Sequence, residues 1–228
     1  MSHYEKAWQA VLQRIDAAVA AASRPRASVQ LLAVSKTFPA AAVRALHACG
    51  QRAFGENYVQ EAAAKIAALA DLTDVQWHLI GPLQSNKTRE AATLFDWIES
   101  VDRARIAQRL SAQRPAGRAP LNVLVEVNVS GEASKSGVPP EAALPLAREI
   151  AGLPNLALRG IMGIPALTAD PAVARAQFRT LAQCFGQLQE AGLAVDTLSM
   201  GMSADLEAAV AAGATQVRVG TAIFGART

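Results

Sequence analysis

The chain has 228 residues, of which 51% are hydrophobic and 18% are charged, and its formal net charge is +3. This length suits one large α/β domain or two small ones, and the apolar content allows a sizeable core. The basic residues are scattered, whereas nucleic-acid binding usually needs a concentrated basic stripe, so we expect no nucleic-acid partner. No segment approaches the roughly 20 apolar residues of a membrane span, so we expect no membrane partner.

Residues 1–22 form an amphipathic, alanine-rich pattern that predicts a helix and lacks the apolar run of a secretory signal. The two cysteines, Cys49 and Cys184, lie in dissimilar helical contexts without metal-ligand spacing. Reduced cysteines without a secretory signal are typical of a cytoplasmic protein.

After this helix, strand-like runs alternate with helical patterns. The predicted strands are Val29–Ser35, Arg52–Gly55, Val75–Gly81, Trp97–Val101, Asn122–Val129, Leu156–Gly163, Thr197–Gly201 and Gln216–Gly220. The predicted helices between them include Ala40–Ala48, Val59–Leu69, Ala104–Ala112, Glu141–Ala151, Ala172–Ala191 and Ala204–Ala211.

Eight strands alternating with helices imply a parallel sheet with right-handed crossovers. We therefore predict a single domain, residues 1–228, in which residues 29–225 form a (β/α)8 TIM-type barrel preceded by the extra N-terminal helix. An open doubly wound sheet is the alternative, but no dinucleotide fingerprint follows the first strand.

Lys36 ends the first predicted strand, and Pro39 suits the first turn of the helix that follows. In a barrel this junction belongs to the active face. A lysine there, among apolar neighbours, can lose its proton and form an imine with an aldehyde. A surface lysine is the alternative.

Asn57 follows the second predicted strand, in the run Phe54-Gly55-Glu56-Asn57-Tyr58. An asparagine at this position is typical of a helix N-cap. Its side chain also lies near the strand-end face, where it can contribute to a site.

Ser203 follows the seventh predicted strand and precedes a helical run that has Asp205 in its first turn. Two interpretations remain open. Ser203 is an ordinary N-cap, or its hydroxyl and the helix N-terminus bind an anion.

Gly220 and Thr221 follow the last predicted strand, and Thr221 can open a short helix that Gly225 ends. Loops after the seventh and eighth strands, with a short extra helix, form the usual phosphate site of these barrels. Arg218 lies inside that strand, where a charge is either paired or functional.

The combination of an imine-forming lysine, a phosphate site and an arginine between them fits pyridoxal 5′-phosphate (PLP). His78 lies on a buried strand, where a hydrogen-bonded core histidine is the first interpretation and a role near the ligand the second. The chain shows no metal-ligand spacing, so we predict no metal site.

Several motifs resemble those of the pyridoxal phosphate homeostasis proteins, the YggS/PROSC-like family, over essentially the full length. They are Leu32-Ala33-Val34-Ser35-Lys36, Phe54-Gly55-Glu56-Asn57-Tyr58, Trp77-His78-Leu79-Ile80-Gly81-Pro82-Leu83-Gln84-Ser85-Asn86-Lys87, Ser134-Lys135-Ser136-Gly137, Leu198-Ser199-Met200-Gly201-Met202-Ser203 and Val217-Arg218-Val219-Gly220-Thr221-Ala222-Ile223-Phe224-Gly225.

The resemblance implies a barrel like the N-terminal domain of alanine racemase, with PLP bound as an imine on Lys36. It implies phosphate contacts from Ser203, Gly220 and Thr221, Arg218 near the pyridine nitrogen, and a role in intracellular PLP homeostasis. Many relatives carry a second lysine where this chain has Phe38, which puts in doubt any cofactor-transfer route that needs a base there.

Arginine is always cationic, so Arg218 would keep the pyridine nitrogen unprotonated and weaken PLP as an electron sink. The alanine racemases resembled here also bring a second acid/base from an extra domain, for which this length leaves no room. We therefore expect a PLP carrier without catalytic residues or efficient catalysis, in contact with PLP-dependent apoenzymes. No long apolar seam demands a dimer, so we expect a monomer. The alternatives are a PLP-dependent amino acid racemase or lyase, and a lysine-imine aldolase acting on a sugar phosphate.

Overall fold

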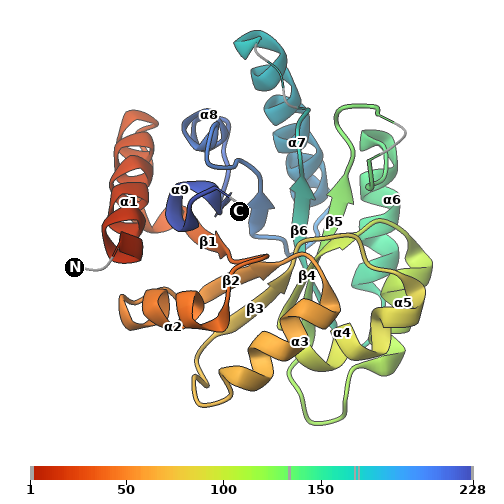
Figure 1. The fold of residues 1–228 in the computed structure, drawn as a ribbon. Helices are drawn as coiled ribbons and strands as arrows, with labels where there is room; N and C mark the ends of the chain where they lie inside the picture. The colour runs from red at the N-terminus through yellow and green to blue at the C-terminus, as the bar shows by residue number, and fades with distance from the viewer. Residues whose placement is uncertain (1–2, 133–134, 167, 169, 227–228) are drawn as a thin grey trace.

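The computed structural model describes residues 3–132, 135–166, 168 and 170–226, and its strands close into one parallel barrel (Figure 1). The strands follow one another around the barrel in chain order, and β1 pairs with β8 to close it. They are β1 (Gln30–Val34), β2 (Ala53–Glu56), β3 (Gln76–Leu79), β4 (Trp97–Val101), β5 (Leu121–Val127), β6 (Leu156–Gly163), β7 (Thr197–Ser199) and β8 (Gln216–Val219).

Helices surround the barrel and connect its strands. They are α1 (His3–Ala21), α2 (Ala40–Ala48), α3 (Val59–Ala68), α4 (Thr88–Leu94), α5 (Ala104–Gln113), α6 (Pro140–Ala151), α7 (Pro171–Glu190), α8 (Leu206–Ala211) and α9 (Thr221–Phe224). None of the described helices is long and apolar enough to cross a membrane.

The predicted (β/α)8 barrel with an extra N-terminal helix is confirmed, and the open sheet is wrong. The predicted ranges of β4, β6 and α2 match the structure residue for residue. We did not predict α4, whose seven residues are too few for a clear 3.6-residue period. The predictions for β3, β5, β7 and β8 extended one or two residues too far, because there the chain leaves the sheet to form the loops at the barrel end.

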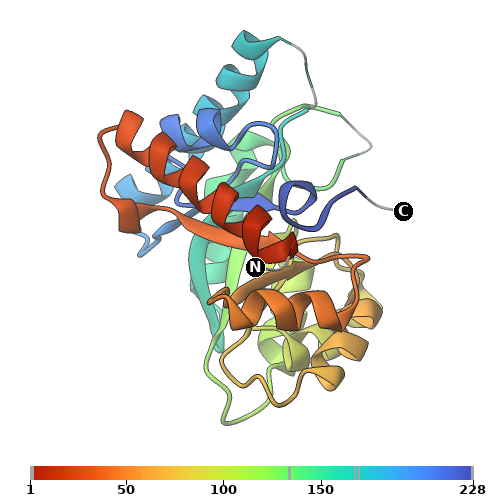
Figure 2. The ribbon, with the colours of Figure 1, turned by 60° about the vertical axis from the view of Figure 1, so that its left-hand side comes forward.

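Helix α1 buries Val11, Ile15, Ala18 and Val19, whose spacing places them on one face of the helix. This face packs against α8 and α9, as Figure 2 shows where the red helix crosses the blue ones. The extra helix is therefore next to the loops that follow β7 and β8.

The barrel interior is partly polar. Glu99 on β4 is bonded to Ser199 on β7 and Gln216 on β8, although β4 neighbours neither strand in the sheet. These bonds therefore cross the interior, which in such barrels is usually filled by branched apolar side chains.

Candidate functional site

Lys36 and Asn57 meet at the barrel end where the strands terminate. The ammonium of Lys36 lies 3.4 Å from Oδ1 of Asn57, and Lys36 is half-buried. The N-cap of α3 is Tyr58, and it has no side-chain cap bond. The capping interpretation of Asn57 is therefore wrong, because its side chain points across to the neighbouring strand end.

The loop that carries Lys36 is anchored by a buried cluster. Lys65 of α3 donates to the carbonyl of Ser35 at 2.7 Å and to both carboxylate oxygens of Glu56 at 2.7 and 2.8 Å. Ser35 donates its hydroxyl to the same carboxylate at 2.5 Å. Burial raises the pKa of Glu56, and the hydrogen bonds from Lys65 and Ser35 oppose that rise. This anchor is not predicted from the sequence, because Lys65 appears there only as one polar residue in a helical pattern.

Gly81, just after β3, fixes the position of Asn57. A side-chain carbon at Gly81 would stand 2.2 Å from the carbonyl oxygen of Asn57. Only glycine permits this approach, so the loop after β3 can press against the residue that faces Lys36.

A small cavity of about 40 Å³ lies beside Lys36, at the ends of β1 and β8. Its lining includes Phe38, Gly220, Thr221 and Gly225. Thr221 begins α9, and Gly225 ends it with a φ of 94°, as predicted. A side-chain carbon at Gly220 would lie 3.1 Å from the carbonyl oxygen of Val34, so this glycine lets β1 approach closely.

Ser203 lies next to α9, close to the same small cavity, and we call this part of the barrel end the small corner. Its hydroxyl accepts a 3.3 Å hydrogen bond from the backbone N–H of Ala222 in α9. The N-cap interpretation is wrong, because α8 begins at Leu206 and Asp205 occupies its N-cap position. Arg14 of α1 donates to the carbonyl of Ser203 at 3.0 Å, a contact between residues far apart in sequence that was not predicted.

Phe38 closes one side of the small cavity. Its ring stacks on Phe224 of α9 with centroids 5.0 Å apart, and Phe224 contacts Tyr4 of α1 at 5.9 Å. In this chain, position 38 is therefore part of an aromatic cluster that joins α1, α9 and the loop after β1.

A second cavity, of about 240 Å³, is also lined by Lys36. The loops after β1, β2, β3, β5 and β6 form it, and its polar lining includes Lys36, Asn57, Glu126, Asn128 and Lys135. Of the motif Ser134-Lys135-Ser136-Gly137, Ser134 lies outside the described residues.

Glu126 is the buried carboxyl group in the wall of this cavity. It is 8% exposed, and its Oε2 has no hydrogen-bond partner among the described residues. Burial and the nearby charge of Asp102 raise its pKa to about 7, although the charge of Arg218 opposes them. Glu126 is not among the predicted site residues, because the strand pattern alone does not distinguish inward from outward positions.

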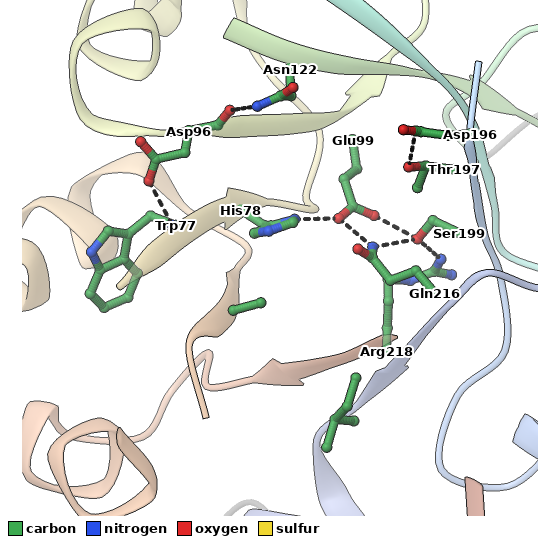
Figure 3. Close-up of polar contacts among 12 residues, drawn as sticks. Trp77, His78, Asp96, Glu99, Asn122, Asp196, Thr197, Ser199, Gln216 and Arg218 are labelled. Carbon is green, nitrogen blue, oxygen red and sulfur yellow. Dashed lines mark hydrogen bonds and ion pairs between the residues drawn. The ribbon is translucent and has the colours of Figure 1, made fainter. Parts of the chain in front are cut away.

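Arg218 is held in the interior by hydrogen bonds, and Figure 3 shows the one to Ser199. Its guanidinium donates to the hydroxyl of Ser199 at 2.8 Å and to the carbonyl of Gly163 at 2.9 Å. Within the described part of the chain it forms no ion pair, so the structural ion-pair interpretation is wrong. Burial lowers the pKa of Arg218, and the charges of Glu99 and Glu126 oppose that shift.

The bond network continues from Ser199 to Glu99 and His78. Ser199 donates to Glu99 at 2.7 Å, and the second Glu99 oxygen lies 2.7 Å from Nδ1 of His78 (Figure 3). Burial opposes ionisation of Glu99, but the hydrogen bond and charge of His78 and the charge of Arg218 lower its pKa overall. His78 also stacks on Trp97 with centroids 5.0 Å apart, which confirms the core-histidine interpretation.

Another cavity, of about 360 Å³, lies at the opposite end of the barrel, among residues such as Trp97 and Gln216. Its two arginines are already engaged: Arg24 with backbone carbonyls and Arg159 with Asp196. None of the predicted site residues lines it. Within the described ranges, no group of three or more His, Cys, Asp or Glu side chains could hold a metal ion.

Comparison with known proteins places the chain in a family. The model of the alanine racemase N-terminal domain matches residues 8–228. A curated protein of Pseudomonas aeruginosa, named pyridoxal phosphate homeostasis protein, is 60% identical over 95% of this chain and 93% of its own length.

Two solved structures have the same fold. A protein of unknown function from Bifidobacterium adolescentis aligns with a TM-score of 0.92 and 38% identity, over 97% of this chain and 94% of its own. PipY of Synechococcus elongatus, with PLP bound, aligns with a TM-score of 0.80 and 42% identity, over 92% of this chain and 100% of its own. The chain therefore belongs to the pyridoxal phosphate homeostasis protein family, whose barrel matches the N-terminal domain of alanine racemase.

Proposed function

We propose that this protein binds PLP at the barrel end around Lys36, holds it as an imine on that lysine, and acts in PLP homeostasis in the cytoplasm without efficient catalysis. The name of the Pseudomonas aeruginosa relative and the PLP bound to PipY support the ligand. The observation that carries the proposal is that Lys36 lines both cavities, the small one at the start of α9 and the larger one next to it.

The small corner fits a phosphate group. The N–H groups of Gly220 and Thr221 lie at the start of α9. No preceding turn of that helix offers carbonyl groups that could accept hydrogen bonds from them. Anions are stabilised at such a position by the N–H groups and by the helix dipole. The hydroxyls of Thr221 and Ser203 add two donors in the same corner, and Asn57 orients the lysine from the other side.

Bound PLP would supply an aldehyde for the lysine and a ring that can delocalise electrons. Arg218 bears on the second property. A guanidinium only donates hydrogen bonds, so beside a pyridine nitrogen it would favour the unprotonated form of that nitrogen. Ser199 and the Gly163 carbonyl fix Arg218 in the interior, which supports a site that holds PLP but activates it weakly.

Reduction with borohydride followed by peptide mapping tests the imine. We expect the fixed adduct on Lys36, and we expect Lys36→Ala to lose the imine absorbance completely while its circular dichroism stays unchanged. The second variant, Lys135→Ala, removes another lysine of the same cavity and should keep the absorbance. An adduct that maps mainly to Lys87 or Lys135 in the wild-type protein would contradict the assignment.

Loss of deuterium from α-labelled alanine, serine and glutamate tests the absence of efficient catalysis. We expect exchange slower by several orders of magnitude than the enzyme median of roughly 10 per second. Turnover near that median on any of the three would instead favour a PLP-dependent racemase or lyase.

A carrier must pass its cofactor on, so PLP-dependent apoenzymes are the partners we propose, with this protein acting as a monomer. Activation of a PLP-free transaminase by the loaded protein, compared with free PLP at the same concentration, measures the transfer. Sedimentation of the loaded protein at several concentrations measures its oligomeric state.

A further inference from the structure

Glu126 faces the cavity from a strand end that cannot easily move. Its carbonyl accepts from the N–H of Val138 at 2.8 Å, and the carbonyl of Val138 accepts from the N–H of Asn128 at 2.8 Å. The backbone is thereby bonded to Val138 at Glu126 and again two residues later, at Asn128. Glu126 is buried and lines the cavity that Lys36 also lines, and its Oε2 has no hydrogen-bond partner in the described part of the chain.

The groups around Glu126 oppose one another in charge. Asp102, at the end of β4, disfavours a second negative charge, whereas Arg218 of β8 favours it. Two lysines line the same cavity, Lys36 beside Asn57 and Lys135 paired with Glu132 at 2.8 Å. Met162, the β6 residue in register with Glu126, contributes no charge.

From this geometry we infer that the carboxyl group of Glu126 takes up a proton when a phosphorylated pyridine binds in the pocket. We call Glu126 the proton-holding residue for this reason. The inference rests on the proposed function, because it concerns the same pocket. A phosphorylated pyridine brings net negative charge, and a carboxylate in the same low-dielectric space would be repelled by it. The neutral acid has an O–H group that can donate a hydrogen bond, so the buried carboxyl group would gain a hydrogen-bond partner.

The alternative is that Glu126 is a buried acid of structural importance only. Its pKa of about 7 means that both protonation states are present near neutral pH, so the two interpretations differ in a measurable way. A structural acid has the same proton occupancy with and without ligand. A proton-holding residue gains occupancy when the ligand binds, so ligand binding is accompanied by proton uptake.

Titration calorimetry with pyridoxine 5′-phosphate measures this uptake directly, because the ligand has no aldehyde and binds without an imine. The binding heat is measured in two buffers of different ionisation enthalpy at about pH 7, near the pKa of Glu126. For the wild-type protein we expect up to about half a proton more per ligand than for Glu126→Gln, which cannot titrate. Glu90→Gln, which removes a partly exposed carboxylate of α4 outside this cavity, should behave as wild type.

The pH dependence of affinity gives the second arm. Above about pH 7, the affinity of the wild-type protein should fall more steeply than that of Glu126→Gln, by up to tenfold per pH unit, because binding must return the proton. If Glu126→Gln does not fold, Glu126→Leu replaces it, since it removes the same proton and needs no hydrogen-bond partner.

Equal proton uptake and parallel pH profiles for wild type and variant would overturn the inference. If borohydride still fixes PLP on Lys36 in that case, the proposed function stands and only the role of Glu126 fails. No binding of pyridoxine 5′-phosphate and no fixed PLP on Lys36 would overturn both.

Discussion

The barrel interior and the layer between strands and helices differ in the polarity of their buried side chains. The outer layer is mostly apolar, with fully buried side chains such as Phe54, Ile98 and Leu110, and the Lys65–Glu56 pair is a polar exception. The interior instead holds a connected set of polar groups, among them Glu99 and Arg218. From this difference we expect substitutions in the outer layer to change stability, and substitutions in the interior to change the proposed ligand site.

Energetics support this division. Full burial of a leucine or phenylalanine contributes about 1.5–3 kcal/mol. A buried ionised group is costly unless it is hydrogen-bonded, and a buried polar network rarely stabilises more than an apolar one of the same volume. Among the residues that the structure describes, the buried polar atoms without a partner include Nε2 of His78 on β3 and Oε2 of Glu126 on β5. We therefore expect these interior polar groups to contribute little to the free energy of unfolding.

Leu110→Ala should have the largest effect on stability and test the outer layer. Leu110 is fully buried in α5, so the variant should lose about 2–5 kcal/mol of unfolding free energy through lost contacts and a cavity. Urea denaturation measures this loss. PLP affinity below the unfolding transition should not change, and a parallel loss of affinity would mean that the two layers are not separable.

Glu126 should give the interior a pH signature of its own. Its pKa lies at about 7 in the folded protein, against an ordinary 4.5, so the folded state holds the proton more tightly. The resulting stability is complete below the ordinary pKa and is lost as the pH rises through about 7, a loss on the order of 3 kcal/mol. Urea denaturation of wild type and Glu126→Gln at about pH 5 and about pH 8 measures it, and parallel changes in the two proteins would contradict the assignment.

The sequence sufficed for the fold because hydrophobic periodicity is a local signal. Each run such as Trp97–Val101 shows its type without reference to other segments, and eight runs alternating with helices leave few topologies. The placement of Lys36 beside Asn57 also follows, because the ends of neighbouring parallel strands meet. Whether the predicted residues hold PLP is not decided by this placement and stays a prediction.

The supports of the site were not predictable, because they connect residues that are distant in sequence. Lys65 reaches Ser35 across 30 residues, and Arg14 reaches Ser203 across 189. The roles of Asn57 and Ser203 were also ambiguous, since both residue types are common helix caps. Only the three-dimensional arrangement shows that their side chains leave the helix starts and face other elements.

Thr221→Ala should weaken phosphate binding in the small corner without changing the packing of the barrel interior or of the outer layer. A hydrogen bond to a charged group is involved, so we expect a loss of about 1–3 kcal/mol in PLP binding. Equilibrium dialysis with PLP and with unphosphorylated pyridoxal separates the phosphate contribution, because only PLP should lose affinity. Thr93→Ala, an exposed threonine of α4, is the matched control. Equal losses for the two ligands would refute the phosphate assignment of Thr221.

Arg14 lies outside the barrel, yet its substitution should change PLP affinity as well as stability. The expected effect is the smallest of those considered. It pairs with Glu207 at 2.8 Å on the surface and also donates to the carbonyl of Ser203. The exposed ion pair contributes less than about 1 kcal/mol to stability. The hydrogen bond to Ser203 positions a predicted phosphate contact, so Arg14→Ala should bind PLP about two- to fivefold more weakly, as for the loss of one ordinary hydrogen bond.

Arg44 offers a matched control for Arg14. It forms a bidentate pair with Asp71 at 2.6 and 2.8 Å, comparably exposed, but on α2 and outside the cavities around Lys36. Arg44→Ala should therefore cost a similar small amount of stability and leave PLP affinity unchanged. Equal PLP affinities for the two variants would show that α1 only covers the barrel. A selective loss in Arg14→Ala, absent with unphosphorylated pyridoxal, would show that the extra helix supports the phosphate corner from outside, through the backbone of Ser203.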